Sequence, residues 1–450
     1  MSAPRPAPRR RRAGRPGERG IALLLVLIGL AVLGLVAHEI RYNSIVEMRL
    51  ATNQRDSVRA YYLARSGLGL ARLMLRFQKQ LDNIQLPNLS GLLGGLLGGA
   101  SGAGGGPAGA GPATPQPQTM TLQLWRMAKI DCYMLQQMVP EEPPESKKGL
   151  GPPSTKSKKF DFDDENPDLA KAQQQKKFGG FTGCFNVTIS DEEERFNVNK
   201  LNAPQLSAQV ALAQSLAMFG DKKFDFLYEK EDANKVKVTA QEVILAMKDW
   251  ADEDETGSSI NLTGQGEPFP RGFSDENGPY QRYEPRYLAK NARFDSLDEL
   301  YAVHGVSDRF MAAFGDKLTV YPDNEAKLNI NTDDPLMLEL AIRSVADPAR
   351  PDPRLGDPVF VDALIKKVRA ARLFAMFGMS ASDFVNIVSS AGVATNPAIQ
   401  ANVAQNRFIG DKSQTYRLKI TGQAGDVTRT ITVVVRVDDG LGRLVHWRED

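Results

Sequence analysis

The 450-residue sequence has few of the residues on which catalytic and metal-binding motifs depend. Its three histidines, His38, His304 and His446, stand alone and show no metal-ligand spacing. It contains no P-loop, no Gly-x-Ser-x-Gly element and no zinc-protease motif. The sequence therefore predicts a protein that is not an enzyme.

Cysteine is also scarce. Cys132 and Cys184 are too few to form a disulfide scaffold. In an oxidising compartment the two residues can make a single bridge, but their positions in the sequence do not show whether they meet. Two unpaired thiols are the open alternative.

Neither sign of charge is in large excess, since the formal net charge is +2. This balance argues against a general role in binding nucleic acid or membrane surfaces. The charge is nevertheless uneven, because residues 1–20 hold seven arginines and one glutamate, a net +6. The remaining chain therefore carries about −4, which is +2 less +6.

Charge is absent from residues 21–37, an apolar run of 17 residues at about the lower limit for a membrane-spanning helix. The arginine-rich flank predicts a cytoplasmic leader and an external body. Three interpretations are open: a cleaved signal peptide, a signal anchor, or a prepilin leader cut after Gly20 that leaves Ile21 as the new N-terminus. A signal peptide fits poorly, because Leu35 stands where its cleavage site needs a small residue.

Proline is missing between Pro16 and Pro87. One helix is therefore predicted over residues 21–81, about 90 Å long at 1.5 Å per residue. Its first third is apolar all round. The remainder is amphipathic, with apolar side chains three or four positions apart except at one gap; these are Leu50, Val58, Tyr61, Ala64, Leu68, Ala71 and Leu75. We expect a membrane stem that continues into a spine for a globular domain.

Composition and periodicity divide the rest of the chain. Residues 87–118 are predicted to be a Gly/Pro-rich linker and 140–180 a disordered insertion, with a short ordered segment at 119–139 between them. Residues 181–202 are predicted to form a β-hairpin whose acidic turn, Ser190-Asp-Glu-Glu-Glu, is a solvated tip. Helical periodicity indicates an inserted helical domain at 203–400, and C-terminal strands follow at 414–450. The predicted fold class is α+β, with a long N-terminal helix packed on an antiparallel sheet and a large helical insertion.

A short motif occurs twice within this plan. Phe196-Asn-Val-Asn and Leu328-Asn-Ile-Asn each precede a proline and a predicted helix. The repetition predicts two similar entries from strand to helix.

The acidic run at 249–255 is the one candidate cation site. Asp252-x-Asp254-x-Thr256-Gly matches the first half of an EF-hand loop, but Thr263 stands where the closing glutamate belongs. A calcium site here needs a distant ligand, for which Glu276 or Asp275 is the candidate. The predicted ligands are Asp249, Asp252, Asp254 and Glu276. A solvated acidic loop is the alternative.

A second motif points weakly to nucleic acid. Residues 295–308 and 328–332 are similar to parts of helix-hairpin-helix modules, which bind phosphate through a Gly-apolar-Gly turn. Here the turn is Gly305-Val-Ser-Asp, which lacks the second glycine and adds a carboxylate, and basic residues do not cluster around it. We expect no nucleic-acid partner.

An ordered set of motifs resembles the K-type minor pseudopilins of type II secretion systems (general secretion pathway protein K). The set consists of residues 20–24 (GIALL), 195–202 (RFNVNKLN), 249–254 (DWADED), 287–300 (YLAKNARFDSLDEL) and 328–332 (LNINT). As in the K type, the fifth position after Gly20 is a leucine, Leu25, where most pilin-like proteins have glutamate.

The resemblance implies a pilin-like sheet, cleavage by prepilin peptidase between Gly20 and Ile21, and methylation of the new N-terminus. It implies an inner-membrane protein with a periplasmic body, assembled at the tip of a pseudopilus that exports folded proteins. Calcium is the implied ion. The implied partners are the I-, J- and H-type minor pseudopilins, bound laterally through the amphipathic face of residues 43–81, and secreted proteins. The alternatives are a minor pilin of a type IV pilus and a membrane-anchored periplasmic binding protein.

Overall fold

The computed structural model describes residues 18–83, 121–127, 129–132, 177–178, 181–229, 231, 237–263, 266–322, 327–372, 377–403, 406–437 and 440–450. Along the first helix, side chains are described from Leu23 onward. The predicted linker at 87–118 lies outside these residues, as does the predicted insertion at 140–180 except for residues 177 and 178.

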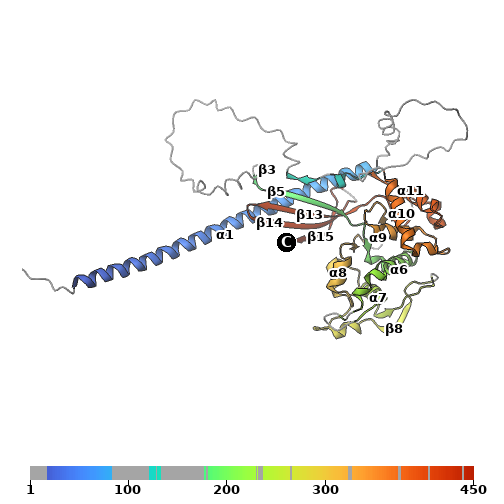
Figure 1. Ribbon diagram of the computed structural model, residues 1–450, viewed down its shortest axis with the longest axis horizontal. Helices are drawn as coiled ribbons and strands as arrows, with labels where there is room; N and C mark the ends of the chain where they lie inside the picture. The colour runs from blue at the N-terminus through green and yellow to red at the C-terminus, as the bar shows by residue number, and fades with distance from the viewer. Residues whose placement is uncertain are drawn as a thin grey trace, which may run out of the picture.

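Helix α1 (Glu18–Asn83) is the longest element, with 66 residues and a length of about 100 Å. Its first half extends away from the rest of the molecule (Figure 1), and the side chains of residues 23–51 are exposed. Farther along, one face is buried at helical spacing by Ala60, Leu63, Ala64, Leu68, Ala71 and Leu75. The helix is thus a bare stem that becomes a spine.

The spine packs on a five-stranded antiparallel sheet in the order β15-β14-β13-β5-β2. The strands are β2 (Ile130–Asp131), β5 (Cys184–Asp191), β13 (Thr415–Ala424), β14 (Val427–Arg436) and β15 (Arg443–Glu449). Gly422 allows the helix and sheet to approach closely, because a Cβ there would lie 2.0 Å from the Ala60 carbonyl oxygen. Side chains from the helix and the sheet share one apolar core.

The predicted hairpin at 181–202 is wrong. Strand β6 (Phe196–Asn197) pairs in parallel with β9 (Leu318–Thr319), whereas β5 pairs with β13 and β2. The acidic turn is also not a solvated tip, because Glu192 is fully buried. Its carboxylate accepts hydrogen bonds from Arg195 (3.0 Å) and Thr319 and is paired with Arg417 (2.6 Å). The turn connects the sheet to the helical domain, and Arg195 nearby and Arg417 from a distant strand compensate the charge of Glu192.

The two cysteines lie at one end of this sheet. Cys132 follows β2, Cys184 begins β5, and a disulfide joins them across a Cα–Cα distance of 5.5 Å. That separation is ordinary for a disulfide. The bridge ties together two strands whose cysteines are 52 residues apart in the sequence.

The helical domain lies between β5 and β13 in the sequence and beyond one end of the sheet in space (Figure 1). Its α-helices are α6 (Gln205–Phe219), α7 (Ala240–Ala251), α8 (Asp308–Phe314), α9 (Pro335–Val345), α10 (Pro358–Ala371), α11 (Ala381–Ser390) and α12 (Pro397–Ala401). Most of them begin at a side chain that caps the first turn, such as Ser307 on Phe310 N and Asp334 on Leu336 N. Val434 of β14 joins the domain's core and so couples it to the sheet.

Short elements complete the described chain. The strands are β1 (Thr121–Leu122), β3 (Lys177–Phe178), β4 (Phe181–Thr182), β7 (Thr256–Ser258), β8 (Arg271–Asp275), β10 (Leu328–Asn329), β11 (Phe377–Gly378) and β12 (Ile409–Gly410). The short helices are α3 (Leu124–Met127), η2 (Val198–Asn202), η3 (Lys222–Leu227), η4 (Pro279–Arg282), η5 (Leu297–Ala302) and η6 (Pro353–Gly356).

The repeated Asn-x-Asn motif has the same role at both positions. Asn199 accepts a hydrogen bond from Phe294 N (2.9 Å) and donates to Phe294 O and Val320 O. Asn331 accepts from Met379 N (2.7 Å) and donates to Met379 O and Asp411 O. Each motif leads into a helix, and each preceding strand pairs in parallel with a later one, β6 with β9 and β10 with β12. The helical domain therefore contains two modules of similar plan, at 196–320 and 328–411.

The predicted α+β fold class is confirmed. The long N-terminal helix, the antiparallel sheet and the inserted helices are all present in the described residues.

Candidate functional site

The end of helix α7 positions two of the predicted metal ligands. The helix begins at a capping box in which Thr239 accepts from Glu242 N and the Glu242 side chain accepts from Thr239 N. It ends at Ala251, so Asp249 lies in the last turn and Asp252 at the C-cap. Residues three apart on a helix lie on the same side, which brings these two carboxylates together.

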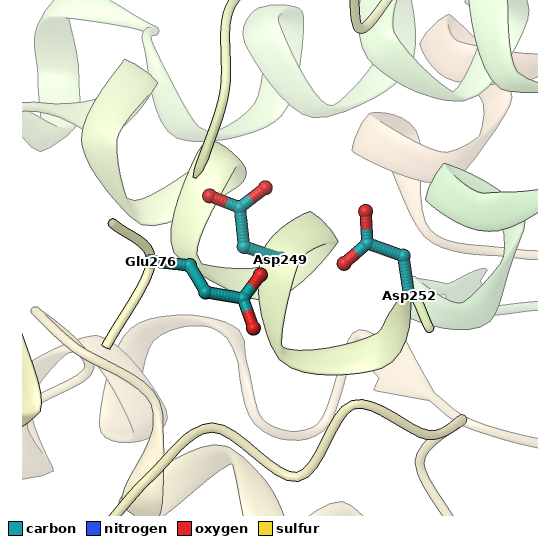
Figure 2. A group of neighbouring side chains, drawn as sticks. All are labelled: Asp249, Asp252 and Glu276. Atoms are coloured by element: carbon teal, nitrogen blue, oxygen red, sulfur yellow. The ribbon is translucent and has the colours of Figure 1, made fainter. Parts of the chain in front are cut away.

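Glu276 approaches them from another segment, directly after β8 (Figure 2). Ligand oxygens of Asp249, Asp252 and Glu276 lie within 4.8 Å of one another. Asp254 is not in this group, since its carboxylate accepts from Thr256 N (2.9 Å) and pairs with Arg271 (3.1 Å). Of the two candidates for a distant ligand, the structure brings in Glu276 and leaves Asp275 exposed.

The hydrogen bonds of this group leave several oxygens free. Asp249 accepts from Ser258 N at 3.0 and 3.2 Å, and Asp252 Oδ2 pairs with Lys248. Asp252 Oδ1 and both carboxylate oxygens of Glu276 are buried without a hydrogen-bond partner. Glu276 is only 5% exposed. A carboxylate buried in this way is costly unless it is protonated or coordinated.

The pKa values follow from this arrangement. Burial, together with the charges of Asp252, Asp249 and Asp254, raises the pKa of Glu276 to about 7, while the Asn291 side chain opposes the rise. Burial also raises the pKa of Asp249 and of Asp252. Clustered carboxylate oxygens that lack partners suit a hard divalent cation, and Ca²⁺ takes ligands of this kind. The residues present therefore fit a calcium ion.

The stem of α1 contains the other predicted site. Helix α1 begins at Glu18, so the backbone at Gly20 and Ile21 is helical, while the side chain of Ile21 lies outside the described part. Leu25 is 63% exposed in the bare stem. The helix contains a segment long and apolar enough to cross a membrane, a test that a signal sequence near an N-terminus also passes.

Among the described residues, nothing covers the face of the second half of α1 that lies opposite the sheet. From Ala60 to Leu75 the amphipathic face is covered by the protein's own sheet, so the expectation that partners bind along this stretch is corrected. Leu50 and Val58, which were predicted to lie on the same face, are exposed. We call the uncovered face opposite the sheet the outer face of α1 and define it by Val58, Tyr62, Gly69, Leu73 and Phe77. Its four large side chains are 43–58% exposed.

Comparison with known proteins finds a relative among secretion-system proteins. No family model matches the chain. A curated relative, type II secretion system protein K of Aeromonas hydrophila, is 27% identical over 179 residues. This chain is similar to type II secretion system protein K. The resemblance inferred from the motifs is thereby confirmed.

The match covers 39% of this chain and 49% of the Aeromonas protein K, so the chain spans about half of that relative's length. A solved structure, the crystal structure of the GspK-GspI-GspJ complex from the enterotoxigenic Escherichia coli type 2 secretion system, has a chain that is 16% identical with a TM-score of 0.39. This likeness covers 61% of the present chain and 83% of the other.

Two features were missed by the sequence reasoning. The buried position of the acidic turn depends on Arg417, which follows it by more than 220 residues and leaves no local signal. The outer face of α1 was missed because an apolar stripe indicates one packing face, and the sheet covers that face. Its signal is present in the sequence, since Tyr62, Leu73 and Phe77 fall on the opposite side at helical spacing. Val58, which was predicted to lie on the packing face, is exposed on the outer face instead.

Proposed function

We propose that this protein is a minor pseudopilin, a structural rather than enzymatic subunit of a type II secretion pseudopilus. The observation that carries the proposal is α1, a single helix that is an exposed apolar stem in its first half and the spine of a sheet in its second. The similarity to protein K supports it. The subunit's task is to help the fibre export folded proteins, with secreted proteins as transient partners.

The stem implies an inner-membrane location, with the leader in the cytoplasm and the sheet and helical domain in the periplasm. The disulfide between Cys132 and Cys184 supports an oxidising compartment for the body.

Prepilin peptidase removes residues 1–20. A bulky side chain before the cut should block processing, so Gly20→Leu should retain the leader. Mass spectrometry that finds residues 1–20 removed normally from this variant would refute the prepilin assignment.

The outer face of α1 is the surface proposed for other minor pseudopilins of the I, J and H types. At its centre Gly69 has no atom within 4 Å of the place a Cβ would occupy, so another helix can approach closely there. Between Asp56 and Asp82 the helix carries five basic residues and no acidic one. Arg65 and Arg76 are exposed beside the apolar side chains. The complementary partner is a helix with an apolar stripe and acidic flanks.

Substitutions at two neighbouring glycines test this surface. Gly69→Leu fills open space and should leave the fold intact, but it should hold a partner helix away and abolish co-purification with co-expressed minor pseudopilins. Gly67→Leu should unfold the protein instead, because a Cβ there meets Phe185 at 2.7 Å. Arg65→Glu should weaken co-purification, whereas Arg309→Glu on exposed α8 should not. Unchanged co-purification of Gly69→Leu would rule out the outer face.

The place proposed in the fibre is the tip. In pilin-like fibres a glutamate at the fifth position is thought to meet a neighbour's N-terminal amine within the hydrocarbon. Leu25 offers no carboxylate for that contact. The helical domain also lies beyond one end of the sheet, where it should obstruct a subunit stacking above (Figure 1). We expect one copy per fibre, and labelling that repeats along the shaft would refute this.

The group formed by Asp249, Asp252 and Glu276 is the proposed calcium site. Its support is the pair of buried Glu276 oxygens that lack any partner. Calcium bound there would compensate three carboxylates and stabilise the helical domain. Because binding to the native state alone raises its stability, the full-length protein in detergent should melt higher with calcium than with a chelator. An unchanged melting temperature at millimolar calcium would rule the site out.

A further inference from the structure

The helical domain is joined to the sheet by two connections of the chain, and these lie side by side. Residues 191–195 lead from β5 into the domain, and residues 411–415 lead from it into β13. Glu192 N donates to Thr415 O at 3.0 Å, so the two connections are hydrogen-bonded to each other. Hinges consist of a few loop residues, and two adjacent connections of this kind allow an inserted domain to turn about them.

Two buried carboxylates hold the connections together. Glu193 accepts from Gln414 N at 2.9 Å, which links the first connection to the second. Asp191 accepts from Glu193 N at 2.8 Å and from Asn329 Nδ2 at 2.9 Å, and Asn329 Nδ2 also donates to Ser413 Oγ at 2.7 Å. Asp191 is 3% exposed and Glu193 is 9% exposed. Both carboxyls are therefore almost fully removed from water at the point where the domain meets the sheet.

The two carboxyls differ from their neighbours in the turn, because neither forms an ion pair within the described part of the chain. Glu192 is paired with Arg195 and Arg417, and Glu194 is paired with Arg126. The partners of Asp191 and Glu193 are instead neutral amides. A buried carboxylate without a cation is costly, and two of them close together are more so.

Charged and titratable groups surround this pair from several elements. They are Glu192, Glu194 and Arg195 of the turn, Arg126 of α3, Lys200 of η2, Lys327 before β10, Asp333 before α9, and Tyr416 and Arg417 of β13. Lys200 is the buried cation nearest in kind to a counter-charge, since Glu193 raises its pKa while burial lowers it to about 8. It makes no ion pair with Glu193 in the structure.

Burial opposes the ionisation of both carboxyls. Burial, together with the charge of Asp191, raises the pKa of Glu193 to about 7, while hydrogen bonds to Glu193 oppose the rise. Burial also raises the pKa of Asp191, against the hydrogen bonds from Ser413, Asn329 and Glu193 N. Hydrogen bonds to a carboxylate favour its ionised form. Asp191 therefore ionises first, and Glu193 keeps its proton to a higher pH.

We propose that Asp191 and Glu193 form a pH-sensitive latch between the two connections. With a proton on Glu193 the pair carries one negative charge, and the latch is closed. When both carboxyls are ionised, two neighbouring buried charges repel each other and the latch opens. Val434 of β14 also packs into the domain's core, so an open latch loosens the domain without releasing it. The placement of the helical domain relative to α1 then depends on the pH of the surrounding compartment.

The direction of the effect follows from the proton on Glu193. In an open latch the carboxyl faces water and regains its ordinary pKa of 4.5, whereas in the closed latch its pKa is about 7. The closed latch thus holds a proton that the open latch has released. Its advantage is lost as the pH rises from about 4.5 to about 7. Lys200, with a pKa of about 8, titrates above this window.

Hydrogen exchange of the full-length protein in detergent tests the latch at pH 5 and pH 8, after correction for intrinsic exchange rates. The opening of residues 191–195 and 411–415 should increase from pH 5 to pH 8 in the wild type. This increase should exceed that of Glu193→Gln by about 10-fold or more, because glutamine keeps an acceptor oxygen and does not ionise. Asp362→Asn, at an exposed carboxyl of α10, is the matched control and should behave as the wild type. Equal increases in the wild type and Glu193→Gln would overturn the latch.

A second variant tests whether the two carboxyls act as a pair. Asp191→Asn removes the neighbouring charge, so Glu193 should ionise more easily and the increase in opening should level off at a lower pH. The same levelling-off pH as in the wild type would show one buried carboxyl acting alone and would overturn the pair. Circular dichroism at pH 5 checks that each variant is folded.

A distance measurement separates movement of the domain from local fraying. Spin labels are attached at Lys419→Cys on β13 and Val359→Cys on α10, two exposed positions on the sheet and the domain. The distribution of label-to-label distances should be narrow at pH 5 and broader at pH 8, and Glu193→Gln should keep it narrow at both. A distribution that does not change with pH in the wild type would refute the proposed effect on the placement of the domain.

Discussion

Replacing Glu276 by glutamine should change the stability of the protein in opposite directions with and without calcium. The carboxylate is 5% exposed, and burial raises its pKa from 4.5 to about 7. Between these two values the native state holds a proton that the unfolded state has released. The stability of the wild type is therefore lost as the pH rises from about 4.5 to about 7, and the full cost is present at pH 8.

The size of this cost follows from the displacement of the pKa. A change from 4.5 to about 7 corresponds to about 3 kcal/mol at most, at 1.36 kcal/mol per pKa unit. Solvent screening reduces it, and we expect about 1–2 kcal/mol. In chelator at pH 8, Glu276→Gln should therefore be more stable than wild type by that amount. For a domain of this size the gain corresponds to roughly 2–4 °C per kcal/mol in Tm.

Calcium should make the wild type the more stable of the two proteins at pH 8. At a free concentration 100 times Kd, an ion that binds only the native state adds about 2.7 kcal/mol. The wild type should gain this stabilisation, and Glu276→Gln should gain much less because it lacks a charged ligand. At pH 5 without calcium the two proteins should differ little in stability, since in the native state residue 276 is then mostly neutral in both of them.

The assay is thermal or urea unfolding of the full-length protein in detergent at pH 5 and pH 8, with calcium or chelator. Comparing variant with wild type cancels the other groups that titrate in this range, such as Glu193 and Glu194, whose pKa burial raises to about 7 and about 8. Asp275→Asn is the matched control, an exposed neighbour that should show no reversal. A variant less stable than wild type in chelator at pH 8, with the same response to calcium, would refute the reasoning.

Three further predictions concern the framework. Replacing Cys132 and Cys184 with serine opens a loop closed across 52 residues and should cost about 4 kcal/mol, measured by urea unfolding; an unchanged midpoint would contradict a structural role for the bridge. Gly422→Ala should cost about 2–3 kcal/mol, because its Cβ would lie 2.0 Å from the Ala60 carbonyl oxygen; Gly29→Ala, in open space on the stem, is the control and should not be destabilised. Glu192→Gln leaves Arg195 and Arg417 without their buried counter-charge and should cost about 3 kcal/mol. Equal stability of that variant would show that the ion pairs of Glu192 do not stabilise the junction between the sheet and the helical domain.

Local patterns in the sequence determined the long helix and much of the element plan. The run from Pro16 to Pro87 has no proline and keeps helical spacing, and a helix depends mainly on such local properties. The C-terminal strands alternate and flank a Gly-Asp turn, so β13 and β14 could be predicted as a hairpin. Asp249 and Asp252 could be paired in advance, because three positions on a helix define one face.

Only the tertiary structure decided how these pieces meet. From the sequence, residues 196–197 were predicted to be the return strand of a hairpin. In the structure they pair with β9, which lies more than 120 residues later. The acidic turn was predicted to be solvated because Arg195 is the one adjacent counter-charge for four consecutive acidic residues. Arg417 and Thr319 supply partners from distant parts of the chain.

In the candidate site too, the sequence determined local features and the tertiary structure determined which residues meet. The sequence determined which carboxylates stand at the end of α7 and that a closing ligand was missing from the loop. The pairing of β7 with β8 decided that Glu276, and not Asp275, turns inward. Glu276 lies one residue beyond the end of β8, where Asp275 accepts from Asn277 N in the turn that follows.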